Sequence, residues 1–364
     1  MSNNFVNRII KFILKILLSL IFILILFIST IIIINTVKDY NPPQKENLKV
    51  YYRNNNYILC DTCVFSFLTW NIGYCGLGKE MDFFYEGGKK VMPSVKLYDK
   101  YKEGISNYLK NNSDIDFILL QEVDFFAKRS YKKNQFEHFS KILNNKYEGV
   151  FAINYNVPFI PLPLSNPMGQ VKSGIVTFSK YKIDSVYRYS LPGSYYWPKK
   201  VFFLDRCIIL SKYKLLNGKY LIIINLHNSA FNDAADIRLL EMNYLKNIMQ
   251  MEYNKGNYVI AGGDWNLNPY SYSPKTIKQK YKAKIIEPAL NNHFFETGWT
   301  YVYDSMVPTN RDVNTPYYND YTKTTIIDFF VVSPNIKVLE IKADDKNFTY
   351  SDHNPVKMKV KLSF

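Results

Sequence analysis

The stretch Tyr258-Val-Ile-Ala-Gly-Gly-Asp-Trp-Asn266 joins a short apolar run, typical of a strand buried on both faces, to two polar side chains. Asp264 and Asn266 therefore come at the end of the strand, where the sheet holds them rigidly enough for metal ligation or acid–base chemistry. Asp and Asn also end strands as ordinary turn formers, so one such segment decides little by itself.

Similar strand ends recur along the chain, and two of the four histidines lie in them. Taken together, they favour a functional site over a set of unrelated turns. The further segments are Trp70-Asn71, Leu120-Gln121-Glu122, Asn225-Leu226-His227, Ile327-Asp328 and Ser351-Asp352-His353.

Between these segments, strand-like runs alternate with helical patterns, and no internal repeat is present. This order predicts one α/β domain of packed sheets flanked by helices. Hydrophobic periodicity predicts strands at 65–70, 116–121, 174–178, 206–215, 220–226, 258–262, 325–333 and 355–362, and helices at 94–111, 136–143 and 234–253. Residues 71–93 and the proline-rich residues 158–167 are predicted to be loops.

The N-terminal sequence is typical of a segment that crosses a membrane. The 22 residues from Ile16 to Val37 carry no charge, and as a helix rising ~1.5 Å per residue they would span a hydrocarbon core of ~30 Å. Arg8, Lys11 and Lys15 precede this stretch, so the positive-inside rule keeps the N-terminus cytoplasmic and exports the rest. A cleaved signal peptide is the alternative, but a run of four bulky isoleucines occupies the place of a small-residue cleavage site.

We therefore predict a cytoplasmic segment at 1–11, a transmembrane signal anchor at 12–37, a linker at 38–64, and one extracytoplasmic domain at 65–364. The linker is polar and contains Pro42-Pro43 and several asparagines. Within it, Cys60 and Cys63 have the spacing of half a zinc site or of a local disulfide. No second Cys or His pair lies nearby, so zinc is the weaker of the two hypotheses.

Composition limits the class of protein further. With 364 residues, 47% of them hydrophobic, the chain can bury a large core, which excludes a disordered or fibrous protein. The net charge is +15, and without Arg8, Lys11 and Lys15 the exported part keeps +12. This excess favours anionic partners such as phosphodiesters or acidic lipids. Abundant Lys, Asn, Ile, Tyr and Phe all have A/T-rich codons, so base composition is an alternative source of the charge.

The strand-end segments, in their order, resemble the endonuclease/exonuclease/phosphatase superfamily, which includes pancreatic deoxyribonuclease. The resemblance covers 65–364, and its most specific pieces are Gly263-Asp-Trp-Asn266 and Ser351-Asp-His353. It implies a four-layered α/β sandwich, with two mixed sheets packed face to face and helices outside, here preceded by one transmembrane helix. It also implies a divalent-metal phosphoesterase site.

The residue types suit that chemistry. Mg²⁺ binds one or two carboxylates and keeps several waters, so Glu122, assisted by Asn71 and Asp352, would supply a partial ligand shell for Mg²⁺ or Mn²⁺. By resemblance, Asp264 positions or deprotonates the attacking water and Asn266 binds a phosphate oxygen.

Two imidazoles would complete the catalytic set. Asp328 lies in an apolar strand, where a charge needs a partner, and by resemblance it orients His353. His227 is the second imidazole, and the division of roles between general base and phosphate clamp stays open. Arg311, shortly before Asp328, could bind a substrate phosphate or form a structural salt bridge.

The residues leave several phosphoester substrates open. Phe329 follows Asp328 where inositol 5-phosphatases have arginine, which argues against that branch. A surface nuclease acting on external DNA or RNA is the first hypothesis. A sphingomyelinase-like lipid phosphodiesterase is the alternative, with the loops 81–85 and 158–167 touching the bilayer. A non-catalytic surface binding module is a third possibility.

Overall fold

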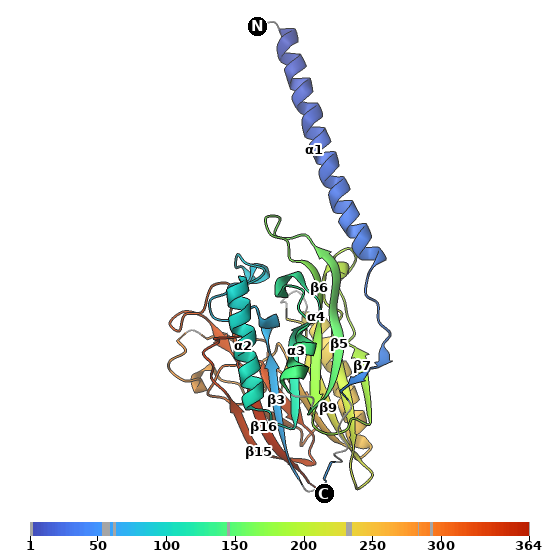
Figure 1. The fold of residues 1–364 in the computed structure, drawn as a ribbon, viewed down its shortest axis with the longest axis vertical. Helices are drawn as coiled ribbons and strands as arrows, with labels where there is room; N and C mark the ends of the chain where they lie inside the picture. Colours follow the sequence, from blue (N-terminus) through green and yellow to red (C-terminus); the bar gives the residue numbers. More distant parts are fainter. Residues whose placement is uncertain are drawn as a thin grey trace.

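Two seven-stranded sheets pack face to face in this protein, and helices cover their outer sides (Figure 1). The structure, a computed structural model, describes residues 3–52, 59–60, 63–143, 146–230, 235–282, 284–291 and 294–363. The helices are α1 (Asn3–Val37), α2 (Val95–Asn111), α3 (Gln135–Ile142) and α4 (Ala235–Asn254). This is the four-layered α/β sandwich expected from the sequence. α1 projects away from the layers and is long and apolar enough over Phe5–Val37 to cross a membrane.

The first sheet brings three candidate site residues to one end. β9 and β10 run parallel with His227 opposite Asp264, and β14 runs antiparallel to β10 with Asp328 opposite Asp264. In spatial order the strands are β1 (Lys45–Asn47), β7 (Ser185–Ser190), β8 (Cys207–Lys214), β9 (Tyr220–His227), β10 (Tyr258–Asp264), β14 (Asp328–Val332) and β11 (Thr300–Val302).

The second sheet supplies the other half of that edge. β3 and β4 run parallel with Asn71 opposite Gln121, so Glu122 follows at the same end. In spatial order the strands are β15 (Ile336–Ala343), β16 (Val356–Leu362), β3 (Val64–Asn71), β4 (Phe117–Asp124), β6 (Gly169–Ser179), β5 (Glu148–Ile160) and β2 (Val50–Tyr51). β12 (Asn310–Arg311) and β13 (Thr324–Thr325) form a small separate sheet.

Each central strand is apolar on both faces because each face is covered. In β9, Leu221 and Ile223 point into the core between the two sheets, whereas Ile222 and Ile224 pack in a second core that includes residues of α4. The strand period of two residues thus explains the continuous apolar runs seen in the sequence. On the second sheet, the outer core is closed by residues of α2 and α3.

Part of the expected linker is instead built into the sheets. β1 pairs with β7 at the edge of the first sheet, and β2 pairs with β5 at the edge of the second. The prediction of a linker over 38–64 is therefore wrong for 45–51. These strands are too short and too polar to be recognised, because an edge strand has only one neighbour to bury it. No disulfide joins Cys60 and Cys63 in the structure.

Other differences concern strand limits and half-exposed strands. β5 continues through Pro158, which was expected to begin a loop, and the strand expected at 325–333 is divided into β13 and β14. β5, β7, β11, β12 and β15 were not predicted. In β15, Lys and Glu alternate with apolar residues along an edge strand, so no continuous apolar run marks it.

Candidate active site

The carboxyl ends of β3, β4, β9 and β10 meet at one edge of the sandwich, where Asp264 occupies the centre of a polar cluster. Its Oδ2 accepts a hydrogen bond of 2.9 Å from Asn71 Nδ2. The same oxygen lies 3.5 Å from His227 Nε2 and 3.7 Å from His353 Nε2. Burial raises the pKa of Asp264 to about 6, although the nearby His353 opposes this rise. The two sheets therefore contribute to a single site.

Glycine at position 263 allows Asp264 to take this place. A Cβ on Gly263 would lie 2.0 Å from the carbonyl oxygen of Leu226 on the neighbouring strand β9. The backbone φ of +153° is also one that side-chain-bearing residues rarely adopt. Only glycine therefore lets β10 approach β9 closely enough to set Asp264 beside His227.

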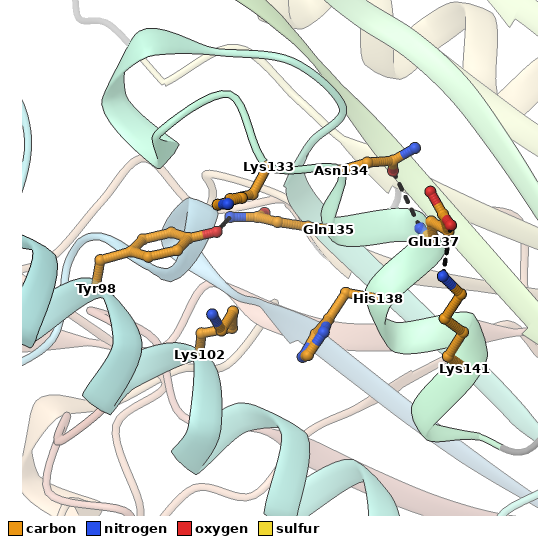
Figure 2. A pocket seen from close by; sticks show the side chains of 8 residues that line it. All are labelled: Tyr98, Lys102, Lys133, Asn134, Gln135, Glu137, His138 and Lys141. Atoms are coloured by element: carbon orange, nitrogen blue, oxygen red, sulfur yellow. Dashed lines mark hydrogen bonds and ion pairs between the residues drawn. The ribbon is translucent and has the colours of Figure 1, made fainter.

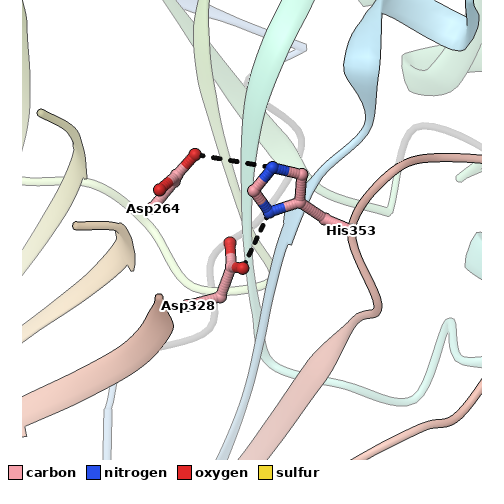
Figure 3. A group of neighbouring side chains, drawn as sticks. All are labelled: Asp264, Asp328 and His353. Atoms are coloured by element: carbon pink, nitrogen blue, oxygen red, sulfur yellow. Dashed lines mark hydrogen bonds and ion pairs between the residues drawn. The ribbon is translucent and has the colours of Figure 1, made fainter. Parts of the chain in front are cut away.

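Asp328 and His353 form a buried pair, shown with Asp264 in Figure 3. Asp328 Oδ2 lies 2.7 Å from His353 Nδ1, so Nε2 of the same ring points toward Asp264. Burial alone would lower the pKa of His353, but the carboxylates of Asp328 and Asp264 raise it well above its usual value. Asp328 thus has the partner that a charge in an apolar strand requires.

His227 is the second imidazole, in a different environment. Its Nδ1 has no hydrogen-bond partner among the described residues. Burial and the neighbouring Arg206 guanidinium hold the pKa of His227 well below its usual value. A neutral imidazole therefore lies on one side of Asp264, and a carboxylate-oriented imidazole lies on the other.

Of the residues expected to bind metal, Asn71 joins Glu122 to Asp264, and Asp352 interacts electrostatically with Glu122. The pairing of β4 with β6 shifts register between Leu120 and Val123, and Glu122 has a left-handed φ of +53°. Such bulges re-aim side chains next to active sites. Asn71 Nδ2 donates to Glu122 Oε1 over 3.2 Å as well as to Asp264, so this amide joins the two carboxylates.

The donor chemistry of this group fits a hard divalent cation. Glu122 and Asp352 interact electrostatically, and that repulsion adds to burial in raising the pKa of Asp352. A cation between the two carboxylates would relieve the repulsion. Among the described residues, a different set, Asp264, Asp328 and His353, has ligand atoms within 4.8 Å of one another. Since Nδ1 of His353 is bonded to Asp328, we favour the first set as the ligands.

Asn266 and Arg206 line the same centre. Asn266 adopts a left-handed φ of +50°, and its Nδ2 donates to the carbonyl of Asn228 over 2.8 Å. Arg206 was not predicted to be a site residue, because in the sequence it looks like the polar first residue of a strand. Its Nη1 donates to the carbonyl of His227 over 3.3 Å, and the guanidinium interacts with Glu241, Asp264 and Glu122.

Asn310 and Arg311 are neighbours with different surroundings. Asn310 Nδ2 lies 3.0 Å from His353 Nε2, although no sequence signal marked this asparagine. Arg311, predicted to bind substrate, is 1% exposed, and its terminal nitrogens donate to five backbone carbonyls. These are the carbonyls of Leu77, Gly78, Met81, Asp312 and Thr315. The guanidinium holds the 77–81 loop, so its role is structural and not that of a phosphate clamp.

A cavity of about 230 Å³ between α2 and α3 lies apart from these residues. Figure 2 shows its lining, in which Lys141 pairs with Glu137 along α3. His138 is bonded to Ser106, and Lys102 to Asp99. Its lining carries Lys102, Lys133 and Lys141 against Glu137 alone, but two of these lysines have carboxylate partners, so we interpret the groove as helix packing with a basic excess.

Comparison with solved structures shows the same fold. An endonuclease/exonuclease/phosphatase from Beutenbergia cavernae matches with a TM-score of 0.55 and 16% identity, over 82% of this chain and 72% of the other. TDP2 from Caenorhabditis elegans matches with 0.52 and 13%, over 82% and 75%. ANGEL2, a 2′,3′-cyclic phosphatase, matches with 0.54 and 14%, over 88% and 99%. No curated protein sequence matched this chain.

The sequence itself carries the family's pattern. The family model described as Endonuclease/Exonuclease/phosphatase family matches residues 68–353, from the strand before Asn71 to His353. Enzymes of this family hydrolyse phosphoester bonds and generally depend on divalent metals. The match covers most of the chain and contains every candidate catalytic and metal-binding residue, and the chain therefore belongs to the endonuclease/exonuclease/phosphatase family.

Proposed function

We propose that this protein is a divalent-metal-dependent phosphodiester hydrolase whose catalytic domain is displayed on the outer side of a membrane. The observation that carries the proposal is the junction at Asp264. One carboxylate oxygen is hydrogen-bonded by Asn71 from the second sheet and lies within 4 Å of both His227 and His353. Such a convergence of buried titratable groups is typical of a hydrolytic centre.

Glu122 and Asp352 would hold Mg²⁺ or Mn²⁺, and Asn71, whose Oδ1 accepts from the Gly73 N–H, would position them rather than bind the metal. The bound cation would polarise a phosphoryl oxygen and stabilise charge on the leaving oxygen. Asn71 keeps Glu122 and Asp264 at a fixed separation by donating to both carboxylates. Gly73 keeps the backbone close to Asp352, since a Cβ there would lie 2.7 Å from Asp352 Oδ1.

On the other side of Asp264, protein side chains would position the attacking water and bind the phosphate. The carboxylate of Asp264 positions the attacking water and accepts its proton. Asn266 and His227 donate to phosphate oxygens, and His353 presents Nε2 while Asp328 fixes its ring through Nδ1. Each donor is held by the fold before substrate arrives, which is the condition for electrostatic stabilisation of a transition state.

Nucleic acid is the first substrate class that we propose, because the exported part carries a net charge of +12 and many aromatic side chains. A lipid phosphodiester is the second candidate, and one structural observation favours it. α1 ends against β5 at the same edge of the sandwich as the catalytic residues, so the site lies near the membrane that α1 would cross.

The full-length chain in phospholipid nanodiscs provides the test. With Mg²⁺ we expect phosphodiester hydrolysis, assayed in parallel on supercoiled plasmid and on sphingomyelin-containing vesicles. EDTA and His227→Ala should abolish it, whereas His138→Ala should not, because His138 lies in the α2–α3 groove. Nicked plasmid would identify a nuclease, and release of the lipid headgroup would identify a lipid phosphodiesterase. A folded protein inactive on both and on a small aryl phosphodiester would overturn the proposal.

A further inference from the structure

The C-terminal end of α1 is fastened to the catalytic domain. Asn35 is completely buried, and its Nδ2 donates to the carbonyl of Phe159 at the end of β5 over 2.8 Å. Thr36 Oγ1 accepts a hydrogen bond from Trp197 Nε1 over 3.1 Å. One turn later, Asp39 pairs with Lys200 over 3.2 Å. The domain therefore has a defined position relative to the helix.

Two loops beside this junction expose apolar side chains. The loop between β5 and β6 presents Leu162 and Leu164, which are 47% and 73% exposed. The segment between β7 and β8 presents Tyr196 and Trp197, which are 94% and 60% exposed. Lys199 and Lys200 follow after Pro198 and are also exposed. Apolar and aromatic side chains bordered by lysines are typical of surfaces that lie in a membrane interface.

The length of α1 places these loops at the membrane boundary. The uncharged stretch from Ile16 to Val37 would extend ~33 Å as a helix, close to the ~30 Å thickness of a hydrocarbon core. Its outer limit thus falls near Thr36, the residue to which Trp197 is bonded. Ile31, one turn before Asn35, is also buried, so the domain covers α1 slightly deeper than that level.

The catalytic edge lies at the same end of the molecule. β5 is antiparallel to β6, which is antiparallel to β4, so β5 ends at the edge where Glu122 lies. β7 likewise runs in the direction of β9 and ends at the edge of His227. Figure 1 shows α1 and the β5–β6 loop leaving the sandwich at this end.

We propose that these two loops form a docking face that seats the catalytic domain on the outer leaflet of the bilayer crossed by α1. The face consists of Leu162, Leu164, Tyr196, Trp197, Lys199 and Lys200, and its partner is the interfacial layer of that bilayer. Trp197 and Tyr196 enter the region between headgroups and acyl chains, and the lysines contact lipid phosphates. The docking face rests on the proposed membrane span of α1, and it holds the active site close to the lipid surface.

Tryptophan fluorescence tests this face directly. The other tryptophans, Trp70, Trp265 and Trp299, are buried in the domain, so Trp197 is the exposed reporter. Full-length protein is placed in nanodiscs of phosphatidylcholine, with or without bromine near the top of the acyl chains. The difference in emission between the wild type and Trp197→Phe is the fluorescence of Trp197. We expect brominated lipid to quench most of this fluorescence.

Two variants in the Trp197→Phe background provide a matched comparison. Leu164→Trp, on the docking face, should be quenched. Leu216→Trp lies in the turn between β8 and β9, at the opposite end from His227, and should not be quenched. Tyr196→Asp combined with Leu164→Trp should restore emission from position 164.

The outcomes separate docking from catalysis. Unquenched emission from Trp197 and from position 164, in protein whose α1 resists alkaline extraction, would overturn the docking face while hydrolysis persists. Extraction of the protein from the membrane would overturn the proposed span and docking together. Quenching without metal-dependent hydrolysis would leave the docking face intact and contradict only the proposed function.

Discussion

Asp328 acts on the proposed reaction through His353, because its carboxylate fixes Nδ1 and leaves Nε2 facing Asp264. The pair is buried, so neither group can exchange its partner for water. A sequence pattern identifies the aspartate as unusual, since it interrupts an apolar strand. Only the fold brings it to a histidine 25 positions further along the chain.

Asp328→Asn should lower kcat by about 10² to 10⁴-fold with little change in KM, because the amide removes the group that orients the imidazole. Steady-state kinetics on a small aryl phosphodiester measure this split. Thermal unfolding of the variant, compared with wild type, serves as the control for folding. An unaltered kcat would contradict the role given to the pair.

Glu122→Gln should weaken metal binding by about tenfold or more, because a neutral amide replaces a carboxylate ligand. Titration calorimetry with Mn²⁺ and the metal dependence of hydrolysis both measure the dissociation constant of the metal. Glu137→Gln on α3 is the matched control, since that exposed carboxylate contacts only Lys141 among the described side chains. Equal metal constants for the two variants would exclude Glu122 as a ligand.

At the scale of secondary-structure elements, polar contacts between the two sheets lie directly under the site. Gln121 of β4 donates to Asn225 Oδ1 of β9 over 2.8 Å, and Asn225 donates to the carbonyl of Val176 over 2.7 Å. Both amides are completely buried. A buried amide is costly unless it is bonded, so these contacts favour one relative placement of the sheets.

Asn225→Leu should lower the free energy of unfolding by about 1–3 kcal/mol, since the donor group of Gln121 and the carbonyl of Val176 lose a partner. Denaturant unfolding in detergent measures the change. Asn254→Ala, at the exposed end of α4, should stay within about 0.5 kcal/mol of wild type. A fully stable Asn225→Leu protein would show that the sheets are placed by apolar packing alone.

Glu252 fastens α4 to the first sheet through Lys212 of β8 and to the following loop through Asn257. Burial alone would raise its pKa, but hydrogen bonds from Lys255 and Lys212 lower it below the usual value. Its stabilising effect is therefore fully present above the pKa of the unfolded chain, about 4.3, and is lost as the pH falls through the folded value.

Glu252→Gln should accordingly reduce the melting temperature at neutral pH, by an amount equivalent to about 1–2 kcal/mol. The difference between variant and wild type should shrink below about pH 4.3 as the carboxylate is protonated. Melting curves recorded at several pH values between neutral and acidic measure this difference in stability. A difference independent of pH would mean that the stabilising effect does not depend on the charge of Glu252.

At the scale of the whole molecule, α1 and the catalytic domain form one arrangement and not two parts joined by a free linker. The edge strands β1 and β2 tie the residues after α1 to both sheets. The hydrogen bonds of Asn35 and Thr36 add a direct contact between helix and domain. If α1 spans a membrane as proposed, access to the site would depend on that membrane as well as on the loops around Asp264.

An epitope inserted at Asn217-Gly218 should be reached by antibody on intact cells, whereas an N-terminal epitope should require permeabilised cells. The turn accepts an insertion because no atom lies within 4 Å of a Cβ placed on Gly218. This expected orientation rests on the positive charges before the apolar stretch. The reverse labelling pattern would place the catalytic domain in the cytoplasm.

The sequence by itself determined the central strands, the helices and most of the cluster around Asp264. Buried strands on both sides of a sheet must be apolar throughout, so a polar residue at a strand end is conspicuous. This local signal was enough to find Asn71, Glu122, His227, Asp264 and His353, because each lies at the end of such a strand or beside Asp352 in a recognisable motif.

Only the tertiary structure decided which of the neighbours Asn310 and Arg311 contacts the site. Successive side chains of an extended strand point in opposite directions, so a shift of one residue exchanges a site contact for a structural one. The direction depends on how β12 pairs with β13 and packs against the loop at 77–81. The edge strands and the contact of α1 with β5 depend in the same way on partners far along the chain, which no local pattern encodes.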